Sequence, residues 1–276
     1  MRVAPSDQQF EGVEPIRFPV AAGRFYPACR DELARLVDGL LSDARPSLPA
    51  GKLRALVAPH AGYVYSGAVA ASAFSAIAAP AKVLRVALLG PSHFEPLDRA
   101  AVSDADIWQT PLGDVHVDDE LRGAAVAAGA IVDSRPHGAD HALEVELPFL
   151  ERRVGADLRV LPIAVGGEDT GATARLVSAL AGDSLIVVST DLSHYLDYDA
   201  ARARDRRTAG AVAALDHGAI RDRDACGAGA LRGLVAHARR AGWLCTLLDL
   251  RTSADATGET RRVVGYGAFA FTEAPE

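Results

Sequence analysis

Three apolar runs in the sequence end in side chains that bind metals or transfer protons. They are LRALVA, which leads to His60, RVALLG, which leads to His93, and LIVVST, which leads to Asp191 and His194. Such runs are typical of buried strands, and ligands of open α/β sheets bind at the carboxyl ends of the strands. Because each run ends in an imidazole or a carboxylate, we predict that the three ends form one site.

A fourth segment, DHALEVELPFL, adds His141, Glu144 and Glu146 to the candidates. If the segment is a helix, His141 and Glu144 share one face, whereas Glu146 points elsewhere. The alternative is an ordinary helix N-terminus that Asp140 caps, with its acidic side chains in solvent. The sequence leaves both interpretations open.

Cys226 lies in ACGAGAL, at the start of a predicted helix. A helix dipole and its free amides favour the thiolate, so we expect a depressed pKa for this thiol. The alternative is a small buried hydrophobic residue, as most free cysteines are. The other histidines are interpreted as structural or surface residues and the other cysteines as packing residues: His116, His137, His217 and His237, and Cys29 and Cys245.

Strands and helices alternate along the chain. Strands are predicted at 53–58, 83–89, 158–165 and 185–189, and helices at 67–78, 118–128, 141–153, 170–181, 198–215 and 226–240. Two closing strands, 243–250 and 263–271, are expected to pair antiparallel. This order predicts a three-layer α/β fold, with a mostly parallel or mixed central sheet flanked by helices. With no linker or repeat in view, residues 1–276 are interpreted as a single domain.

Composition excludes several classes of function. The net charge is −7, and the densest basic run, 202–207, is interrupted by Asp205, so no clustered basic face predicts nucleic-acid binding. No stretch approaches the ~18 apolar residues that span a bilayer. The first residues lack the apolar core of a signal peptide, and three cysteines without paired spacing favour a reducing compartment. We therefore expect a cytoplasmic protein.

Seven segments carry a resemblance to a known family. They are AGRFYPA (22–28), PHAGYVYSG (59–67), LGPSHF (89–94), TPLGDVHVD (110–118), DHALEVELPFL (140–150), STDLSHY (189–195) and ACGAGAL (225–231). The sequence resembles the Memo family, which includes the AmmeMemoRadiSam system protein B group. That family is similar in fold to the class III extradiol dioxygenases, in which two histidines and a glutamate hold iron(II).

The resemblance implies a mononuclear metal site. The two histidines fall on His60 and His93, and a cysteine that replaces the dioxygenase glutamate falls on Cys226. A thiolate softens such a site and favours copper, zinc or iron. The resemblance therefore implies one metal ion per chain, with iron or copper first and zinc as a further choice.

The resemblance also implies roles beside the metal. His194 would be a general acid and base, Asp191 would set its tautomer or bind a water, and His141 would be a histidine near the pocket. From the sequence we further expect three tyrosines at the mouth of the pocket: Tyr63, Tyr65 and Tyr195.

Three functions remain open at the level of sequence. The first is metal-dependent redox chemistry on an unknown small molecule. The second is a non-enzymatic, metal-binding accessory protein that works with Ammecr-type and radical SAM partners, as the family name implies. The third is a zinc-dependent hydrolase, in which metal-bound water is the nucleophile.

Overall fold

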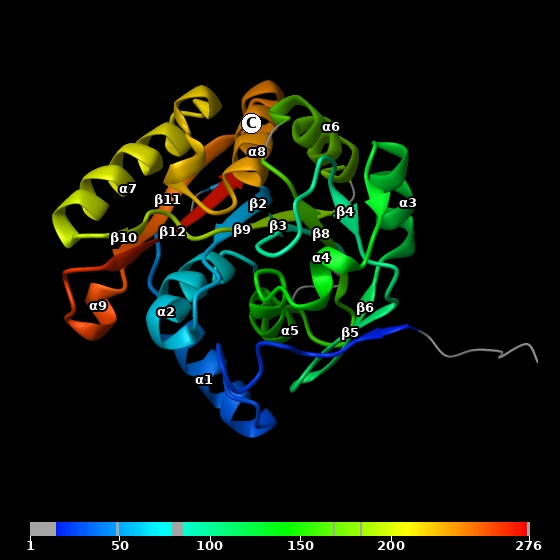
Figure 1. The fold of residues 1–276 in the computed structure, drawn as a ribbon, viewed down its shortest axis with the longest axis horizontal. Helices are drawn as coiled ribbons and strands as arrows, with labels where there is room; N and C mark the ends of the chain where they lie inside the picture. The colour runs from blue at the N-terminus through cyan, green and yellow to red at the C-terminus, as the bar shows by residue number, and fades with distance from the viewer. Residues whose placement is uncertain (1–14, 48–49, 79–84, 168, 183, 275–276) are drawn as a thin grey trace, which may run out of the picture.

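A mixed sheet between two groups of helices forms the body of the protein (Figure 1). The computed structural model describes residues 15–47, 50–78, 85–167, 169–182 and 184–274. Helices α1, α2 and α5 lie on one face of the sheet and α6, α7 and α8 on the other. The helices are α1 (Arg30–Asp43), α2 (Tyr63–Phe74), α3 (Asp119–Ala127), α4 (Arg135–Gly138), α5 (Leu147–Val154), α6 (Thr170–Leu180), α7 (Tyr198–Ala213), α8 (Ala228–Ala241) and α9 (Ala254–Thr257), with 3-10 turns η1 (Glu144–Glu146), η2 (His217–Ala219) and η3 (Asp222–Asp224).

The sheet order in the described part of the chain is β1-β5-β6-β8-β3-β9-β2-β12-β10; β11 also pairs with β12, and β4 pairs with β7 and β8. The strands are β1 (Ile16–Arg17), β2 (Leu53–Ala58), β3 (Arg85–Pro91), β4 (Ala101–Val102), β5 (Ile107–Thr110), β6 (Gly113–Val117), β7 (Ile131–Val132), β8 (Arg159–Val165), β9 (Leu185–Ser189), β10 (His194–Leu196), β11 (Leu244–Thr252) and β12 (Val263–Thr272). None of the described helices is both long and apolar enough to cross a membrane.

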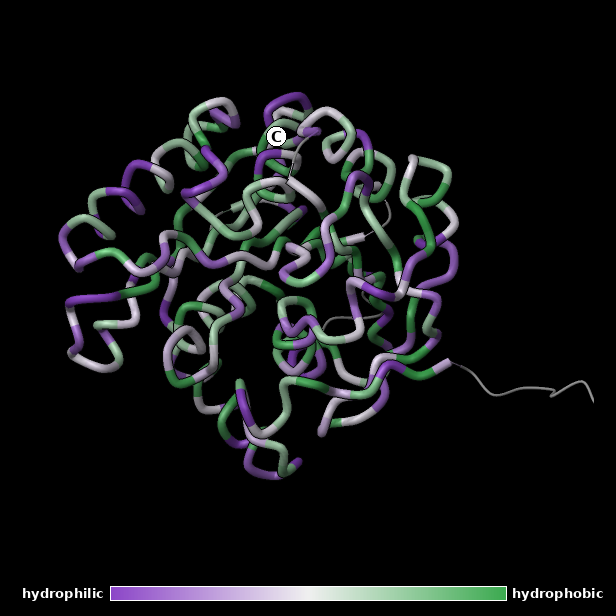
Figure 2. Tube along the Cα trace, viewed as in Figure 1, coloured by the Kyte–Doolittle hydropathy of each residue, from purple (hydrophilic) through white to green (hydrophobic). Residues whose placement is uncertain are grey.

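The central strands β8, β3, β9 and β2 run parallel to one another. They are continuous apolar runs because helices cover both faces of the sheet, which leaves no solvated side for polar residues. Figure 2 shows the hydrophobic residues gathered along these strands and hydrophilic residues on the outer helices. Ala58 pairs with Ser189, so β2 and β9 end side by side, and β3 flanks β9 on its other edge. The predicted meeting of three strand ends is confirmed.

Most predicted elements are present, with shifted ends. The pairing of β11 with β12 is antiparallel, as expected, and α8 ends at Gly242 in the left-handed conformation, at φ 70°. The helix predicted at 67–78 begins earlier, at Tyr63, and ends at Phe74. Residues 83 and 84 of the second predicted strand lie outside the described residues.

One helix prediction is wrong at its start. His141 lies in a loop, because the chain forms the 3-10 turn η1 before α5 begins at Leu147. Glu144 is fully buried rather than solvated, since it pairs with Arg17 and accepts the amide of Ala21 at 2.9 Å. The shared helical face proposed for His141 and Glu144 therefore does not exist.

Candidate metal centre

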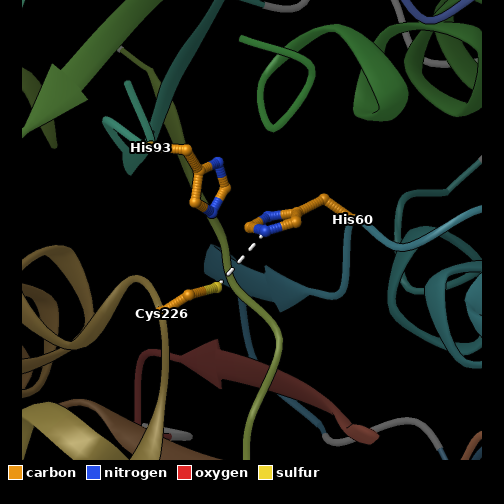
Figure 3. Close-up of side chains that lie close together, drawn as sticks. All are labelled: His60, His93 and Cys226. Atoms are coloured by element: carbon orange, nitrogen blue, oxygen red, sulfur yellow. Dashed lines mark hydrogen bonds between the residues drawn. The ribbon is translucent and has the colours of Figure 1, made fainter. Parts of the chain in front are cut away.

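His60, His93 and Cys226 converge at the carboxyl edge of the sheet (Figure 3). One ligand atom from each of the three side chains lies within 4.8 Å of the others. His60 follows β2, His93 follows β3, and Cys226 lies between η3 and α8. Segments far apart in the sequence are thus brought together by the order β3-β9-β2 of the sheet.

The spacing of the donor atoms suits one metal ion. Cys226 Sγ lies 3.3 Å from His60 Nε2. Metal–sulfur and metal–nitrogen bonds of roughly 2.3 and 2.1 Å in a tetrahedral site place two ligand atoms about 3.5 Å apart. The His60 and His93 rings meet edge to face, with centroids 5.3 Å apart. A thiolate and two imidazoles are a donor set for iron, copper or zinc.

The orientation of His60 is fixed by Ser189. His60 Nδ1 lies 2.8 Å from Ser189 Oγ, and the same hydroxyl lies 2.7 Å from the Ala142 carbonyl and 2.7 Å from Glu146 Oε1. The carbonyl can only accept, so the hydroxyl donates to it and accepts a hydrogen bond from Nδ1–H of His60. Nε2 is then left with a lone pair. Burial lowers the pKa of His60 well below its usual value, with the charges of His93 and His141 adding to the effect.

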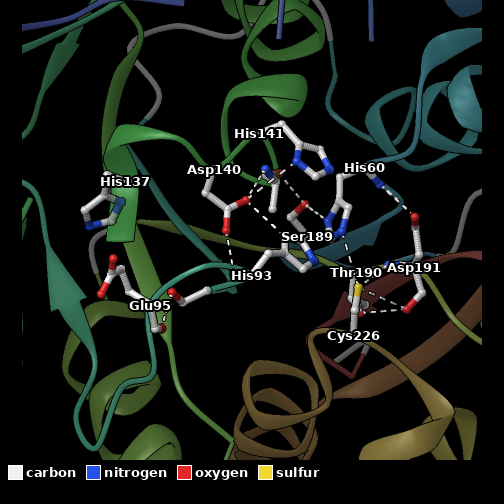
Figure 4. Close-up of polar contacts among 12 residues, drawn as sticks. His60, His93, Glu95, His137, Asp140, His141, Ser189, Thr190, Asp191 and Cys226 are labelled. Carbon is white, nitrogen blue, oxygen red and sulfur yellow. Dashed lines mark hydrogen bonds and ion pairs between the residues drawn. The ribbon is translucent and has the colours of Figure 1, made fainter. Parts of the chain in front are cut away.

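Glu146 extends this chain of contacts away from the site. It is buried, and burial raises the pKa of its carboxyl well above the usual value. A protonated carboxyl donates to Ser189 Oγ, which is compatible with the hydroxyl donating to Ala142. Figure 4 shows Ser189 next to His60, with the His141 ring close to His60 and Asp140 beside His93.

His93 is oriented by Asp140. Its Nδ1 lies 3.0 Å from Asp140 Oδ1, and its backbone amide donates to Asp140 Oδ2 at 2.6 Å. Burial lowers the pKa of His93, but the hydrogen bond and charge of Asp140 outweigh it, and the net pKa is raised. His93, Asp140 and His141 also lie close enough to hold an ion. Because Asp140 also accepts from the Ala142 amide, its oxygens are engaged, and it holds His93 in the way that orienting carboxylates hold histidines at metal sites.

The expected low pKa of Cys226 is wrong for the metal-free site. The cysteine precedes Gly227, the N-cap of α8, and burial raises its pKa to about 12. The charge of Asp191 acts in the same direction. Burial outweighs the helix dipole and the Asp191 amide, which donates to Sγ at 3.3 Å. Binding of a metal to this thiol would therefore release a proton.

Gly227 allows the cysteine loop to approach the strand end. A Cβ added at Gly227 would lie 2.8 Å from the Thr190 Cβ, closer than two carbons pack. The Gly227 amide donates to Thr190 Oγ1 at 2.8 Å, which ties the loop to the residue after β9. Cys226 is thereby held beside His60.

A cavity of about 820 Å³ opens next to the three candidate ligands. His141, Asp191 and His194 line it together with His60, His93 and Cys226. Burial raises the pKa of Asp191 to about 7, and burial lowers the pKa of His194. Within the described residues, Asp191 accepts the His60 amide at 2.9 Å, and no hydrogen bond joins Asp191 to His194. The prediction that Asp191 sets the tautomer of His194 is therefore not supported by a contact between the two side chains.

His141 forms one wall of the cavity. Its ring stacks on Phe25, with centroids 4.0 Å apart, and on His93, with centroids 5.2 Å apart. Burial lowers the pKa of His141 to about 4, so the imidazole is neutral near pH 7. Its catalytic role stays a prediction.

Other residues singled out from the sequence lie away from the ligands. His137 and His237 are buried, His137 in α4 and His237 against Trp243. Cys29 is exposed, so its interpretation as a packing residue is wrong. Tyr63 is buried and its hydroxyl donates to the Val145 carbonyl, so it does not lie at the pocket mouth as expected. The other two predicted tyrosines, Tyr65 and Tyr195, do line the cavity.

Two supporting residues are absent from the candidates that the sequence gives. Asp140 is interpreted there only as a possible helix cap, and Ser189 as the end of a strand. Glu146 is among the candidates, but its contact with Ser189 is not predicted. Ser189 immediately precedes the Thr190-Asp191 strand exit, which was the one available signal for its position.

Comparisons with known proteins agree with these motifs. The family described as Memo-like protein matches residues 17–270. A MEMO1 family protein of Methanopyrus kandleri is 32% identical over 284 residues, covering 92% of this chain and 98% of that protein. A MEMO1 family protein of Aeropyrum pernix is 34% identical over 279 residues, covering 92% of this chain and 98% of that protein. One of Aquifex aeolicus is 38% identical over 199 residues, covering 69% of this chain and 72% of that protein. The chain belongs to the Memo family.

Proposed function

We propose that the protein binds one metal ion through His60, His93 and Cys226 and performs redox chemistry on a small molecule held in the adjoining cavity. The observation that carries this proposal is the convergence of two imidazoles and a thiol at the edge of a cavity of about 820 Å³. Such a volume is in the range of small-molecule sites. Three protein ligands leave coordination positions open toward the cavity.

The proposed ion is iron or copper, with zinc as a further choice, because a thiolate makes the site soft. In fold and ligand position we propose kinship with the class III extradiol dioxygenases, with Cys226 in place of their carboxylate. Iron or copper, when bound, would supply a redox-active centre, whereas zinc would act only as a Lewis acid. A reducing compartment such as the cytoplasm fits the exposed free thiol of Cys29.

His194 is the proposed acid–base group. It lines the cavity, and burial lowers its pKa, so its neutral imidazole is able to accept a proton from a bound molecule near pH 7. We expect His194→Gln to retain the metal and to lose about 10²–10⁴-fold in turnover, once a substrate is known. Loss of metal in this variant would assign His194 to the ligand set instead.

Elemental analysis tests the metal site. Protein purified anaerobically without chelator should contain up to one iron or copper ion per chain, and His60→Ala and His93→Ala should each lose most of it. His237→Ala is the matched control, because His237 is a buried histidine that packs on Trp243. Equal loss of metal in His237→Ala and His60→Ala would refute the site.

The identity of the metal separates the alternatives. Stoichiometric zinc in anaerobically purified protein would favour the hydrolase, for which Cys and His ligands are equally suitable. Cys226→Glu should shift preference from copper toward iron(II), because a carboxylate is the harder ligand. An accessory protein that works with Ammecr-type and radical SAM partners would bind metal but would not need to bind a small molecule in the cavity. The presence of a large cavity therefore favours the enzyme.

A further inference from the structure

Tyr195 lies in the cavity with a strained backbone. Its φ is 59°, in the left-handed region that residues other than glycine rarely adopt. The irregular pairing of β10 with β12, which shifts register between His194 and Leu196, accommodates this conformation. Backbone strain of this kind concentrates at functional sites. Here it turns the exposed Tyr195 side chain into the cavity wall, next to the His194 ring at a centroid distance of 5.7 Å.

The guanidinium of Arg262 lies over the Tyr195 ring. Its Cζ is 5.0 Å from the ring centroid, and both side chains line the cavity. The N–H groups of a guanidinium lie in its own plane. A guanidinium that stacks on an aromatic face therefore keeps these N–H groups available to bind an anion. Tyr195 thus serves as a platform that orients Arg262.

Arg262 differs from its neighbour in its charge partners. Arg261 is paired with Glu259, with its Nε 3.2 Å from Glu259 Oε1. Among the described residues, no carboxylate lies within ion-pair distance of Arg262. Arg262 is the arginine in the lining of this cavity, which also carries two carboxylates, Asp191 and Glu259. Both carboxylates have partners, since Asp191 accepts the His60 amide and Glu259 pairs with Arg261.

We propose that Arg262, held by Tyr195, binds the carboxylate of a small organic acid whose other end reaches the candidate metal ligands. This inference rests on the proposed function and names its substrate class. A guanidinium fork matches a carboxylate in two parallel hydrogen bonds. Phosphate groups at protein sites commonly recruit several donors, including backbone amides, whereas this mouth offers one guanidinium.

The aromatic lining favours an acid with a planar body. Phe25, Tyr65 and Tyr266 line the same cavity as Tyr195. Flat rings pack against one another in offset or edge-to-face arrangements, so a ring-bearing acid fills the space between the metal ligands and Arg262. Benzoate is the simplest probe with both features, and benzamide is its neutral counterpart of equal shape.

Calorimetric titration of the full chain, as purified, tests the proposal. We expect benzoate to bind about tenfold more tightly than benzamide, since hydrogen bonds to a charged partner are the stronger ones. Arg262→Gln should abolish this preference, and Arg261→Gln, the matched control, should keep it. Equal binding of the two probes to the unmodified chain, no detectable binding of either, or loss of the preference in both variants would overturn the proposal.

Two further measurements sharpen the result. Phenyl phosphate is titrated in parallel, and an Arg262-dependent preference for it over benzoate would replace the carboxylate by a phosphate monoester. Metal content is measured on each sample and should be unchanged in Arg262→Gln. Absence of metal from the unmodified chain refutes the proposed function, whatever the probes do. A preference for benzoate that persists in Arg262→Gln refutes the anion site alone.

Discussion

Glu146 and His60 lie on either side of one hydroxyl group, that of Ser189. The hydroxyl oxygen is 2.7 Å from Glu146 Oε1 and 2.8 Å from His60 Nδ1. The strand end that supplies Ser189 therefore holds the imidazole, and the carboxyl behind it holds the hydroxyl. This arrangement matches the outer partners that orient metal-binding histidines in other proteins.

Removal of the hydroxyl should weaken metal binding. We expect Ser189→Ala to lower metal affinity about 10–100-fold, because the His60 ring loses the partner that fixes its orientation. Competition against a chromophoric chelator measures the affinity. Ser72→Ala is the control, since Ser72 is a buried serine that contacts Asp249 and Ala68 rather than a candidate ligand. Equal affinities of Ser189→Ala and the unmodified protein would show that Ser189 does not support His60.

The three thiols should differ in reactivity, in an order set by exposure. In metal-free protein we expect iodoacetamide to label Cys29 first, because it is exposed, while burial raises the pKa of both Cys226 and Cys245 to about 12. Mass spectrometry of peptides sampled over time gives the three rates. Faster labelling of Cys226 than of Cys29 would show that the Cys226 thiol is activated after all.

The backbone at Tyr195 should reverse the usual ranking of alanine and glycine. At a φ of 59°, alanine keeps the steric strain and glycine does not. We expect Tyr195→Gly to be about 1 kcal/mol more stable than Tyr195→Ala in urea unfolding, although glycine ordinarily destabilises. At Tyr198, in α7, the same pair of substitutions should rank in the ordinary order and serves as the control. The same order at both positions would mean that Tyr195 is not strained.

Glu151 should make stability depend on pH far from the candidate site. Burial raises its pKa from 4.5 to about 7, against the opposing hydrogen bond from Thr110. The folded state thus binds this proton more tightly than the unfolded state does, and its stability falls as pH rises from 4.5 to about 7. We expect Glu151→Gln to gain on the order of 2 kcal/mol over the unmodified protein at pH 8, and little near pH 4.

Chemical unfolding at a series of pH values measures this difference. Glutamine keeps the length of the side chain and a partner for Thr110, so the comparison isolates the charge. Glu259→Gln is a matched control, because Glu259 is fully exposed and should show no such gain with rising pH. A constant gap between Glu151→Gln and the unmodified protein from pH 4 to pH 8 would contradict a raised pKa.

The sequence was sufficient to predict the site residues at the strand ends, but not the residues that orient them. His60, His93 and Asp191 were located because apolar runs identify buried strands, and parallel strands end at one edge. The ligand role of Cys226 came from the resemblance. Asp140 and Ser189 escaped notice because their partners lie 47 and 129 residues away, and no local pattern records such contacts.

Two errors share one physical cause. The Cys226 pKa and the exposure of Glu144 were both judged from neighbours along the chain. In the folded protein, Cys226 is half-buried at the sheet edge, and Glu144 meets Arg17 from a strand 127 residues earlier. Tertiary burial outweighed the local helix argument in both cases.

The distance along the chain between His60 and Cys226 sets when the centre is able to form. The two residues are separated by 166 positions, although their side-chain atoms lie 3.3 Å apart. At a ribosomal rate of ~5–20 residues per second, roughly 10–30 s pass between the synthesis of the first ligand and that of the last. During that interval the nascent polypeptide presents the two imidazoles without the thiol, so the three candidate ligands come together only after Cys226 has been synthesised.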